Sequence, residues 1–212
     1  NYVLLDFILD TVNAAGQNMV TLAAKVACDY IKQQTNHSFF LESNLNSDKK
    51  ASFRNMILGR GHGVIAETHV TKSVMTRVLN VDQDFLYESF NYFPIVSAMA
   101  GTHGNGLHIS NALTAIYLAT GQDTACVAEN SLGHFNLQKS DGGLTFRLTL
   151  PSLTIGTVGG GTRLNQQQQN LRLLGCDNGE HSSRKLAEII AAAALGLEIS
   201  LGSAIMSHTW TS

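Results

Sequence analysis

The spacing of apolar residues along the chain alternates between a helical and a strand period, and this alternation predicts the order of the elements. Met19, Leu22, Val26 and Tyr30 recur at helical spacing, so a helix with an apolar face is predicted over residues 18–34. The same kind of spacing predicts helices at residues 72–79, 83–93, 108–120, 163–174 and 185–206.

Strands are predicted at residues 38–45, 64–70 and 144–150, and the last of these alternates cleanly. Pro94 is predicted to end the helix at 83–93, because proline lacks the N–H that a helix needs. Gly121 stands where the C-terminal cap of the helix at 108–120 belongs. Since helices alternate with strands, the predicted fold class is α+β, in the sense of mixed α/β.

Composition limits the classes of function. The 212 residues are 44% hydrophobic and 14% charged, which predicts a sizeable core and extensive burial within the fold or at a subunit interface. A net charge of -2 gives no reason to expect a nucleic-acid partner. Any bound phosphate must therefore be held by local groups.

Cysteine usage and hydropathy predict the compartment. Cys28, Cys126 and Cys176 lie far apart and outside any C-x-x-C pair, so they are interpreted as reduced thiols in the cytoplasm. Neither they nor the histidines have metal-ligand spacing, and no metal site is predicted. The chain has no uncharged run of about 18 residues, so no membrane segment is predicted in it. A membrane anchor in an N-terminal region outside these residues is compatible with the sequence.

Residues 156–162 (GTVGGGT) form the sharpest local motif. Three consecutive glycines before a helix expose backbone N–H groups at the positive end of a dipole, where a phosphate can approach closely. The motif is neither G-x-G-x-x-G nor a P-loop. A tight structural turn is an equally good interpretation of this segment taken alone.

Two charged positions are candidates for catalysis. Lys49 lies between Asp48 and Lys50, and adjacent ammonium groups lower each other's pKa, so Lys49 could stabilise an oxyanion. Asp123 follows a helix C-terminus, where a buried carboxyl group would have a raised pKa. For each residue alone, a solvated loop or turn is the simpler interpretation.

A series of short motifs follows in order along the chain: NAAGQNM (13–19), SDKK (47–50), GRG (59–61), SAMAG (97–101), NALTAIYLATGQD (111–123), LPS (150–152), GTVGGGT (156–162) and EISL (198–201). Each motif is weak alone. Together, in this order and at this approximate spacing, they resemble the hydroxymethylglutaryl-coenzyme A reductase family over essentially all of the chain. The resemblance is strongest to the class I type, which uses NADPH.

The resemblance implies a fold and a set of partners. A small nucleotide-binding domain would be inserted in a large, helix-rich coenzyme-A-binding domain, and both would be only partly present. Residues 1–40 would be the C-terminal part of the small NADPH-binding domain, and residues 41–212 part of the large catalytic, substrate-binding domain. The family works as dimers or tetramers with active sites between subunits, so other copies of the chain are expected partners.

The resemblance also implies a reaction, in which two hydride transfers from NADPH reduce hydroxymethylglutaryl-coenzyme A to mevalonate and free coenzyme A. Lys49 would stabilise the developing oxyanion, and Asp123 would hydrogen-bond to that lysine. The implied substrate contacts are Asn44, Asp48, Lys50, Asn111, Ser200, Leu201 and Ile205. The implied cofactor contacts are Asn13, Ala14, Gly16, Gln17, Asn18, Gly159, Gly160, Gly161 and Thr162.

The sequence departs from the family pattern at several positions. The family's catalytic glutamate would lie upstream of Asn1, and its catalytic histidine about two positions past Ser212, because His208 falls too early. The chain is therefore expected to be cut short at both ends. Asn13 stands where the family has aspartate.

Two alternatives remain open from the sequence. One is another coenzyme-A or nucleotide oxidoreductase that shares only the glycine motif, although it should lack the pair formed by Lys49 and Asp123. The other is a non-catalytic or degenerate fragment that binds coenzyme A or a nucleotide, which the missing glutamate and histidine support.

Overall fold

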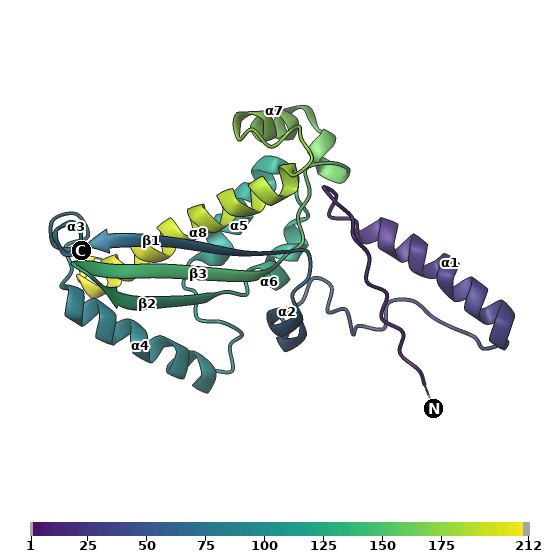
Figure 1. Cartoon of the computed structure of the whole chain (residues 1–212), viewed down its shortest axis with the longest axis horizontal. Coiled ribbons are helices and arrows are strands. Elements are labelled where there is room, and N and C mark those ends of the chain that lie inside the picture. The colour runs from purple at the N-terminus through teal and green to yellow at the C-terminus, as the bar shows by residue number, and fades with distance from the viewer. Residues whose placement is uncertain (1, 210–212) are drawn as a thin grey trace.

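A computed structural model of the chain describes residues 2–209, and a three-stranded antiparallel sheet forms its centre (Figure 1). The strands are β1 (His62–Thr71), β2 (His134–Ser140) and β3 (Gly143–Leu153), in the order β1-β3-β2. β3 is the middle strand, and its alternate residues from Leu144 to Leu150 are all fully buried. The other residues of the strand turn toward the opposite face, so the period of two predicted for this segment is confirmed.

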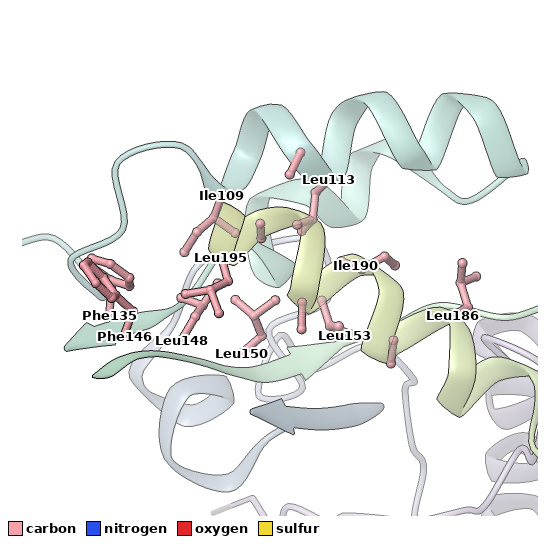
Figure 2. Close-up of a cluster of buried hydrophobic side chains, with 14 of the residues drawn as sticks. Ile109, Leu113, Phe135, Phe146, Leu148, Leu150, Leu153, Leu186, Ile190 and Leu195 are labelled. Atoms are coloured by element: carbon pink, nitrogen blue, oxygen red, sulfur yellow. The ribbon is translucent and has the colours of Figure 1, made fainter. Parts of the chain in front are cut away.

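Two helices build the core against that face of the sheet (Figure 2). Helix α8 (Ser182–Met206) packs on the strands, and helix α5 (Ile109–Thr120) packs on α8. Leu148 and Leu150 point from β3 toward Ile190 and Leu195 of α8, and all four side chains are buried. Burial of each such side chain contributes about 1.5–3 kcal/mol, so this layer holds the fold together.

Shorter helices surround this core. They include α3 (Lys72–Arg77) and α7 (Asn165–Leu173), and the predicted helices at these places are confirmed. The structure adds elements that the sequence analysis did not predict: α2 (Phe53–Leu58), α6 (Val127–Asn130) and the 3-10 turns η1 (Thr124–Cys126) and η2 (Gly160–Arg163). The α+β class is confirmed.

Helix α4 (Gln83–Met99) corrects the prediction that Pro94 ends a helix, because the helix continues through that residue. Phe90 on the preceding turn packs against Phe93 and against Phe135 of β2, with ring centroids 4.6 and 5.2 Å apart. This packing holds the turn that contains Pro94. The proline therefore removes one backbone hydrogen bond without ending the helix.

The N-terminal part of the chain confirms one prediction and corrects another. Helix α1 (Gln17–Thr35) forms where a helix with an apolar face was predicted, and Met19, Leu22, Val26 and Tyr30 on that face are exposed. Residues 38–45 form no strand. A strand needs a neighbour for its backbone groups, and the pairing ladders within residues 2–209 join β1, β2 and β3 to one another.

By length and apolar composition, α8 could cross a membrane, and no other helix within residues 2–209 meets that criterion. The helix contains Glu188 and Glu198, and Glu198 is fully buried. One side of α8 packs on the sheet and another on α5 (Figure 2). A central core helix has the same length and composition, so these features are weak evidence for a membrane span.

Candidate functional site

Lys49 and Asp123 form an ion pair at the edge of the fold. The Lys49 Nζ atom lies 2.8 Å from Asp123 Oδ2, and both side chains are about 40% exposed to solvent. Asp123 precedes η1, and its Oδ1 accepts the backbone N–H of Ala125 at 3.0 Å. The prediction that Lys49 and Asp123 meet at one site is therefore confirmed for their positions.

The electrostatics of this pair differ from the sequence-based expectation. The hydrogen bond to Asp123 raises the pKa of Lys49 above its ordinary value, and it outweighs the effect of burial. The same hydrogen bond lowers the pKa of Asp123. The expected depression by Lys50 and the expected rise for Asp123 are both wrong, because the direct contact between opposite charges dominates. Lys49 is thus a stable ammonium at neutral pH.

A buried carboxylate lies behind the lysine. Glu129 of α6 is fully buried, and its Oε2 accepts the backbone N–H of Lys49 at 2.7 Å. Arg60 Nη1 lies 2.8 Å from both oxygens of Glu129 and 2.7 Å from Asp48 Oδ1. Arg60 therefore joins the loop that carries Lys49 to the interior of the fold.

Glu129 is held from the other side by the end of β3 and the residues after it. Thr154 Oγ1 donates to Glu129 Oε1 at 2.7 Å, and Asn130 Nδ2 donates to the Ser152 carbonyl at 2.5 Å. Sequence reasoning missed Glu129, because an isolated acidic residue after Cys126 carries no motif of its own. Arg60 lay in a quoted motif but was given no role.

The predicted cofactor segment and the glycine motif lie side by side. Ala14 pairs with Val158 in a parallel bridge, and the Thr157 N–H donates to the Asn13 carbonyl at 2.8 Å. Gln122 holds the glycine motif from the other side, since its side-chain amide both donates to and accepts from the Gly156 backbone at 2.9 Å. Two segments far apart in sequence thus form one surface.

The three glycines of this motif differ in their surroundings. Gly159 and Gly160 have positive φ angles of 84° and 52°, and a Cβ atom on either would meet nothing within 4 Å. Their outer side is open, as a cradle for a ligand must be. A Cβ atom on Gly161 would lie 2.6 Å from the Gly121 carbonyl oxygen. Close packing against Gly121 therefore explains the third glycine. Thr162 is buried, and its hydroxyl donates to the Gly159 carbonyl at 2.6 Å.

The side chain of Asn13 faces the start of α8. Its Oδ1 accepts from the Ser183 N–H at 3.1 Å and from the Ser183 hydroxyl at 3.0 Å, and its Nδ2 donates to the Gly179 and Glu180 carbonyls at 3.1 Å. These bonds occupy both the Nδ2 donor group and the Oδ1 acceptor of the Asn13 side-chain amide. Asn13 therefore ties the segment to α8, whereas the nearby Asn18 is exposed.

Gln17 links the cofactor segment to the lysine loop. Its Nε2 donates to Asp48 Oδ1 at 2.9 Å, next to the bond that Arg60 makes to the same oxygen. Gly16 begins α1 with a φ angle of 75°, which favours glycine and directs the helix away from the sheet (Figure 1). The structure thus brings both predicted halves of the site, cofactor and catalytic, into hydrogen-bond contact.

Predicted substrate residues fall into two groups. Asn44, Asp48 and Lys50 lie in the lysine loop, where Lys50 Nζ donates to the Asp48 carbonyl at 3.1 Å. Asn44 is exposed, and Asp48 is half-buried. These three residues share one loop with Lys49, and their contact with substrate stays a prediction.

The second group lies elsewhere in the fold. Asn111 is on the first turn of α5, and its amide lies 3.4 Å from the His108 ring. That helix start is held by Glu198 of α8, which accepts the Leu107 N–H at 2.8 Å. Ser200, Leu201 and Ile205 follow Glu198 along α8.

Ser200, Leu201 and Ile205 lie in the C-terminal part of α8, whereas Asn13 contacts its N-terminal end. Ser183 contacts Asn13, and at 1.5 Å per residue Ser200 is roughly 26 Å further along the helix. Burial of Glu198 raises the pKa of its carboxyl group, although the backbone N–H groups that it accepts oppose this. Within one copy of the chain, Ser200, Leu201 and Ile205 therefore lie far from the Asn13 segment, to which Gln17 joins the lysine loop.

All of these residues lie within the part of the chain that one family model matches. The sequence model of the family described as Hydroxymethylglutaryl-coenzyme A reductase matches residues 1–212. The chain is 40% identical over 204 residues to the 3-hydroxy-3-methylglutaryl-coenzyme A reductase of Methanocaldococcus jannaschii, covering 92% of this chain and 50% of that protein.

Further relatives share the same name. The 3-hydroxy-3-methylglutaryl-coenzyme A reductase of Aeropyrum pernix is 40% identical over 213 residues, which cover 97% of this chain and 51% of that protein. The one from Aspergillus terreus is 38% identical over 216 residues, covering 96% and 20% respectively. The chain thus spans about half the length of the archaeal relatives that it matches.

Proposed function

Because the chain belongs to the hydroxymethylglutaryl-coenzyme A reductase family, we propose that it carries part of the active site of an enzyme that reduces hydroxymethylglutaryl-coenzyme A to mevalonate and coenzyme A with NADPH. The observation that carries the proposal is the Lys49–Asp123 ion pair at 2.8 Å. It lies beside a surface formed by the cofactor segment and the open glycines, to which Gln17 connects it.

The chemistry requires a cation at the reacting carbonyl oxygen. NADPH, when bound, supplies one hydride to each of the two reductions. As the first hydride adds to the thioester carbon, negative charge develops on its oxygen, and the Lys49 ammonium stabilises that charge. The C–S bond then breaks, coenzyme A leaves as a thiolate that takes up a proton, and an aldehyde remains. The second hydride and a further proton convert the aldehyde to the primary alcohol of mevalonate.

Asp123 keeps Lys49 in its charged form and fixes its direction. The pKa of Lys49 is raised from an ordinary value that already lies well above neutral pH, so the side chain is an ammonium that can stabilise an oxyanion. The pair is partly exposed at the surface of the chain. A substrate carbonyl could therefore approach the ammonium from outside without a change in the core.

The surface beside the pair fits a nucleotide. Gly159 and Gly160 present backbone without side chains. No heavy atom among residues 2–209, other than those of the glycines' own chain neighbours, lies within 4 Å of the place where a Cβ atom would stand on either. Their segment leads into η2 and then α7, so backbone N–H groups are available to an anion. We assign Ala14, Gly16, Gln17, Asn18, Gly159 and Gly160 to the cofactor surface, with Asn13, Gly161 and Thr162 supporting it.

The separation of the two substrate groups supports an active site shared between subunits. Asn44, Asp48 and Lys50 accompany Lys49 in one copy. Asn111, Ser200, Leu201 and Ile205 of a second copy would complete the site, which requires a homo-oligomer. We assign residues 1–40 to the small nucleotide-binding domain and 41–212 to the large domain. The free Cys28, Cys126 and Cys176 thiols support a cytoplasmic location.

Steady-state kinetics on the full-length protein tests the proposal. With hydroxymethylglutaryl-coenzyme A, two NADPH should be oxidised for each mevalonate and each coenzyme A formed, and Lys49→Ala should abolish turnover. Absence of NADPH oxidation by the unmodified protein would contradict the enzyme and favour a non-catalytic binding role. A clear preference for NADH would leave the reaction in place but overturn the cofactor assignment.

A further inference from the structure

Lys49 has a backbone conformation that its side chain does not favour. Its φ angle is 58°, in the left-handed region that residues with a Cβ atom rarely adopt. Such a conformation persists only where surrounding contacts impose it. Within the loop, the Lys50 N–H donates to the Ser47 carbonyl at 3.1 Å, which makes Lys49 the third residue of a β-turn, a position at which a positive φ occurs. From outside the loop, the Lys49 N–H donates to the fully buried Glu129 carboxylate at 2.7 Å.

The hydrogen bonds within the loop shape this turn but do not attach it to the body of the fold. Ser47 accepts the Lys50 N–H at 3.1 Å, and Asn46 accepts the Asp48 N–H at 3.4 Å, so these bonds stay within the loop. Restraint from the body of the fold reaches the loop through Glu129 and through Arg60, which binds Asp48 and Glu129 together. The position of Lys49 is thus set from the interior.

We propose that Glu129 is a positioning residue: its buried carboxylate, paired with Arg60, anchors the turn in which Lys49 has its left-handed backbone and so directs the ammonium at Asp123. This inference rests on the proposed function, in which Lys49 stabilises the oxyanion. Glu129 itself is enclosed and does not touch substrate. It acts through the backbone of the lysine.

A purely structural role for Glu129 is a weaker explanation. Burial of two charges costs about as much as their attraction returns, so apolar replacements of buried ion pairs are often neutral or stabilising. The hydrogen bonds of the Glu129 side chain explain why a carboxylate occupies this position. A carboxylate has two oxygens, and Oε1 is bonded to Thr154 while Oε2 is bonded to the Lys49 N–H, with Arg60 2.8 Å from both.

The test measures the state of Lys49 directly and turnover separately. Glu129→Gln keeps the size of the side chain but loses the charge that holds Arg60. The control is Tyr117→Phe, which removes the 2.6 Å hydrogen bond from the buried Tyr117 hydroxyl to Asn130 and leaves the Lys49 contacts in place. Acylation of Lys49 is followed by mass spectrometry across a pH series, with Lys139, paired with Asp84 on the surface, as the internal reference.

In Glu129→Gln, the acylation midpoint of Lys49 should move to lower pH, because a misdirected ammonium loses the Asp123 bond that raises its pKa. The kcat for hydroxymethylglutaryl-coenzyme A reduction should fall by about 10- to 100-fold, while the KM for NADPH changes by less than about twofold. Tyr117→Phe should change neither the Lys49 midpoint nor kcat, even where it lowers the melting temperature.

An unchanged Lys49 midpoint in folded Glu129→Gln overturns the inference, whatever the activity. If Glu129→Gln does not fold, the double variant Arg60→Gln/Glu129→Gln removes both charges and is measured in the same way, and an unchanged midpoint there also overturns it. If the unmodified protein turns out to have no reductase activity, the proposed function fails, and the acylation series still decides whether Glu129 positions Lys49.

Discussion

The Lys49 ammonium lies 2.8 Å from the Asp123 carboxylate, and the two partners are held by different means. Asp123 caps a 3-10 turn through its other oxygen, which accepts the Ala125 N–H. Lys49 projects from an irregular loop that is joined to the rest of the fold by the Glu129 carboxylate and by Arg60, which binds Asp48. Asp123 is therefore the fixed partner, and Lys49 is the one whose direction depends on its surroundings.

Removal of Asp123 should change the pH at which Lys49 loses its proton. In Asp123→Asn, the pKa of Lys49 should fall, because the hydrogen bond to Asp123 is the main cause of its rise. The acylation midpoint of Lys49, measured by mass spectrometry, should move to lower pH, and kcat should drop by about 100-fold or more. An unchanged midpoint in Asp123→Asn would show that the ion pair does not form in solution.

The pH dependence of the pair has a defined sign at both ends. The pKa of Asp123 is lowered, so its contribution to stability is present above the unfolded pKa and is lost as pH falls through the folded value. The pKa of Lys49 is raised, so its contribution is present below the unfolded pKa and is lost as pH rises through the folded value. Unfolding by urea at several pH values should show Asp123→Asn losing stability relative to the unmodified protein between these limits, and converging with it beyond them.

Gly160→Ala should weaken cofactor binding more than it affects folding. The added Cβ meets nothing in the chain but would occupy the space of a ligand, and the positive φ costs about 1 kcal/mol. The dissociation constant for NADPH, measured by fluorescence titration, should rise more than tenfold, which corresponds to about 1.4 kcal/mol.

Two other glycines supply the controls for this prediction. Gly142, in the hairpin between β2 and β3, has a φ of 69° and equally open surroundings, so Gly142→Ala carries the same backbone cost without an effect on NADPH. Gly161→Ala should destabilise the fold by about 1–3 kcal/mol, because its Cβ would press on Gly121. Normal NADPH binding by folded Gly160→Ala would make the motif a structural turn.

Asn13→Ala should loosen the start of α8. The change removes side-chain bonds to Ser183 and to the Gly179 and Glu180 carbonyls, and it should cost about 1–2 kcal/mol in the free energy of unfolding. Urea denaturation measures this cost. Asn18→Ala, at an exposed position five residues along the chain, should stay within about 0.5 kcal/mol. Equal effects of the two variants would contradict the supporting role of Asn13.

Mixed oligomers should reveal whether the site is shared. Lys49→Ala and Ser200→Trp damage different groups, and each variant alone should be inactive. Random mixing in a dimer would leave one intact site in half of the molecules, so about a quarter of the activity should return. A mixture that stays inactive, although mass spectrometry shows hybrids, would place both groups in the same subunit and contradict the shared site.

The sequence alone predicted an element correctly where the apolar residues kept one helical or strand period over a long segment. The alternation of Leu144 to Leu150 predicted the middle strand, and the Ala/Leu/Ile run predicted α8. β2 was missed although Phe135 and Leu137 are buried and alternate with polar residues, because the segment is short and carries His134, Gln138 and Lys139. Its alternation became clear only with β3 beside it.

The candidate site shows which properties could not be predicted from local sequence patterns. The pairing of Lys49 with Asp123 followed from resemblance, and the structure confirms their contact. The directions of their pKa shifts did not follow, because these depend on a 2.8 Å contact between segments far apart in sequence. Glu129 was missed for the same reason, since its neighbours Arg60 and Thr154 come from other elements. The exposure of the apolar face of α1 also depends on tertiary contacts, which the local pattern does not contain.

The left-handed backbone of Lys49 lowers the stability of the fold at the position where the proposed reaction needs a lysine. A residue with a Cβ atom in that conformation costs about 1–2 kcal/mol, whereas glycine adopts it freely. Replacement of Lys49 by glycine should therefore remove this cost, but a protein without the ammonium should lose the turnover proposed above. Efforts to stabilise this protein should leave position 49 unchanged and seek their gains elsewhere, for example on the exposed apolar face of α1.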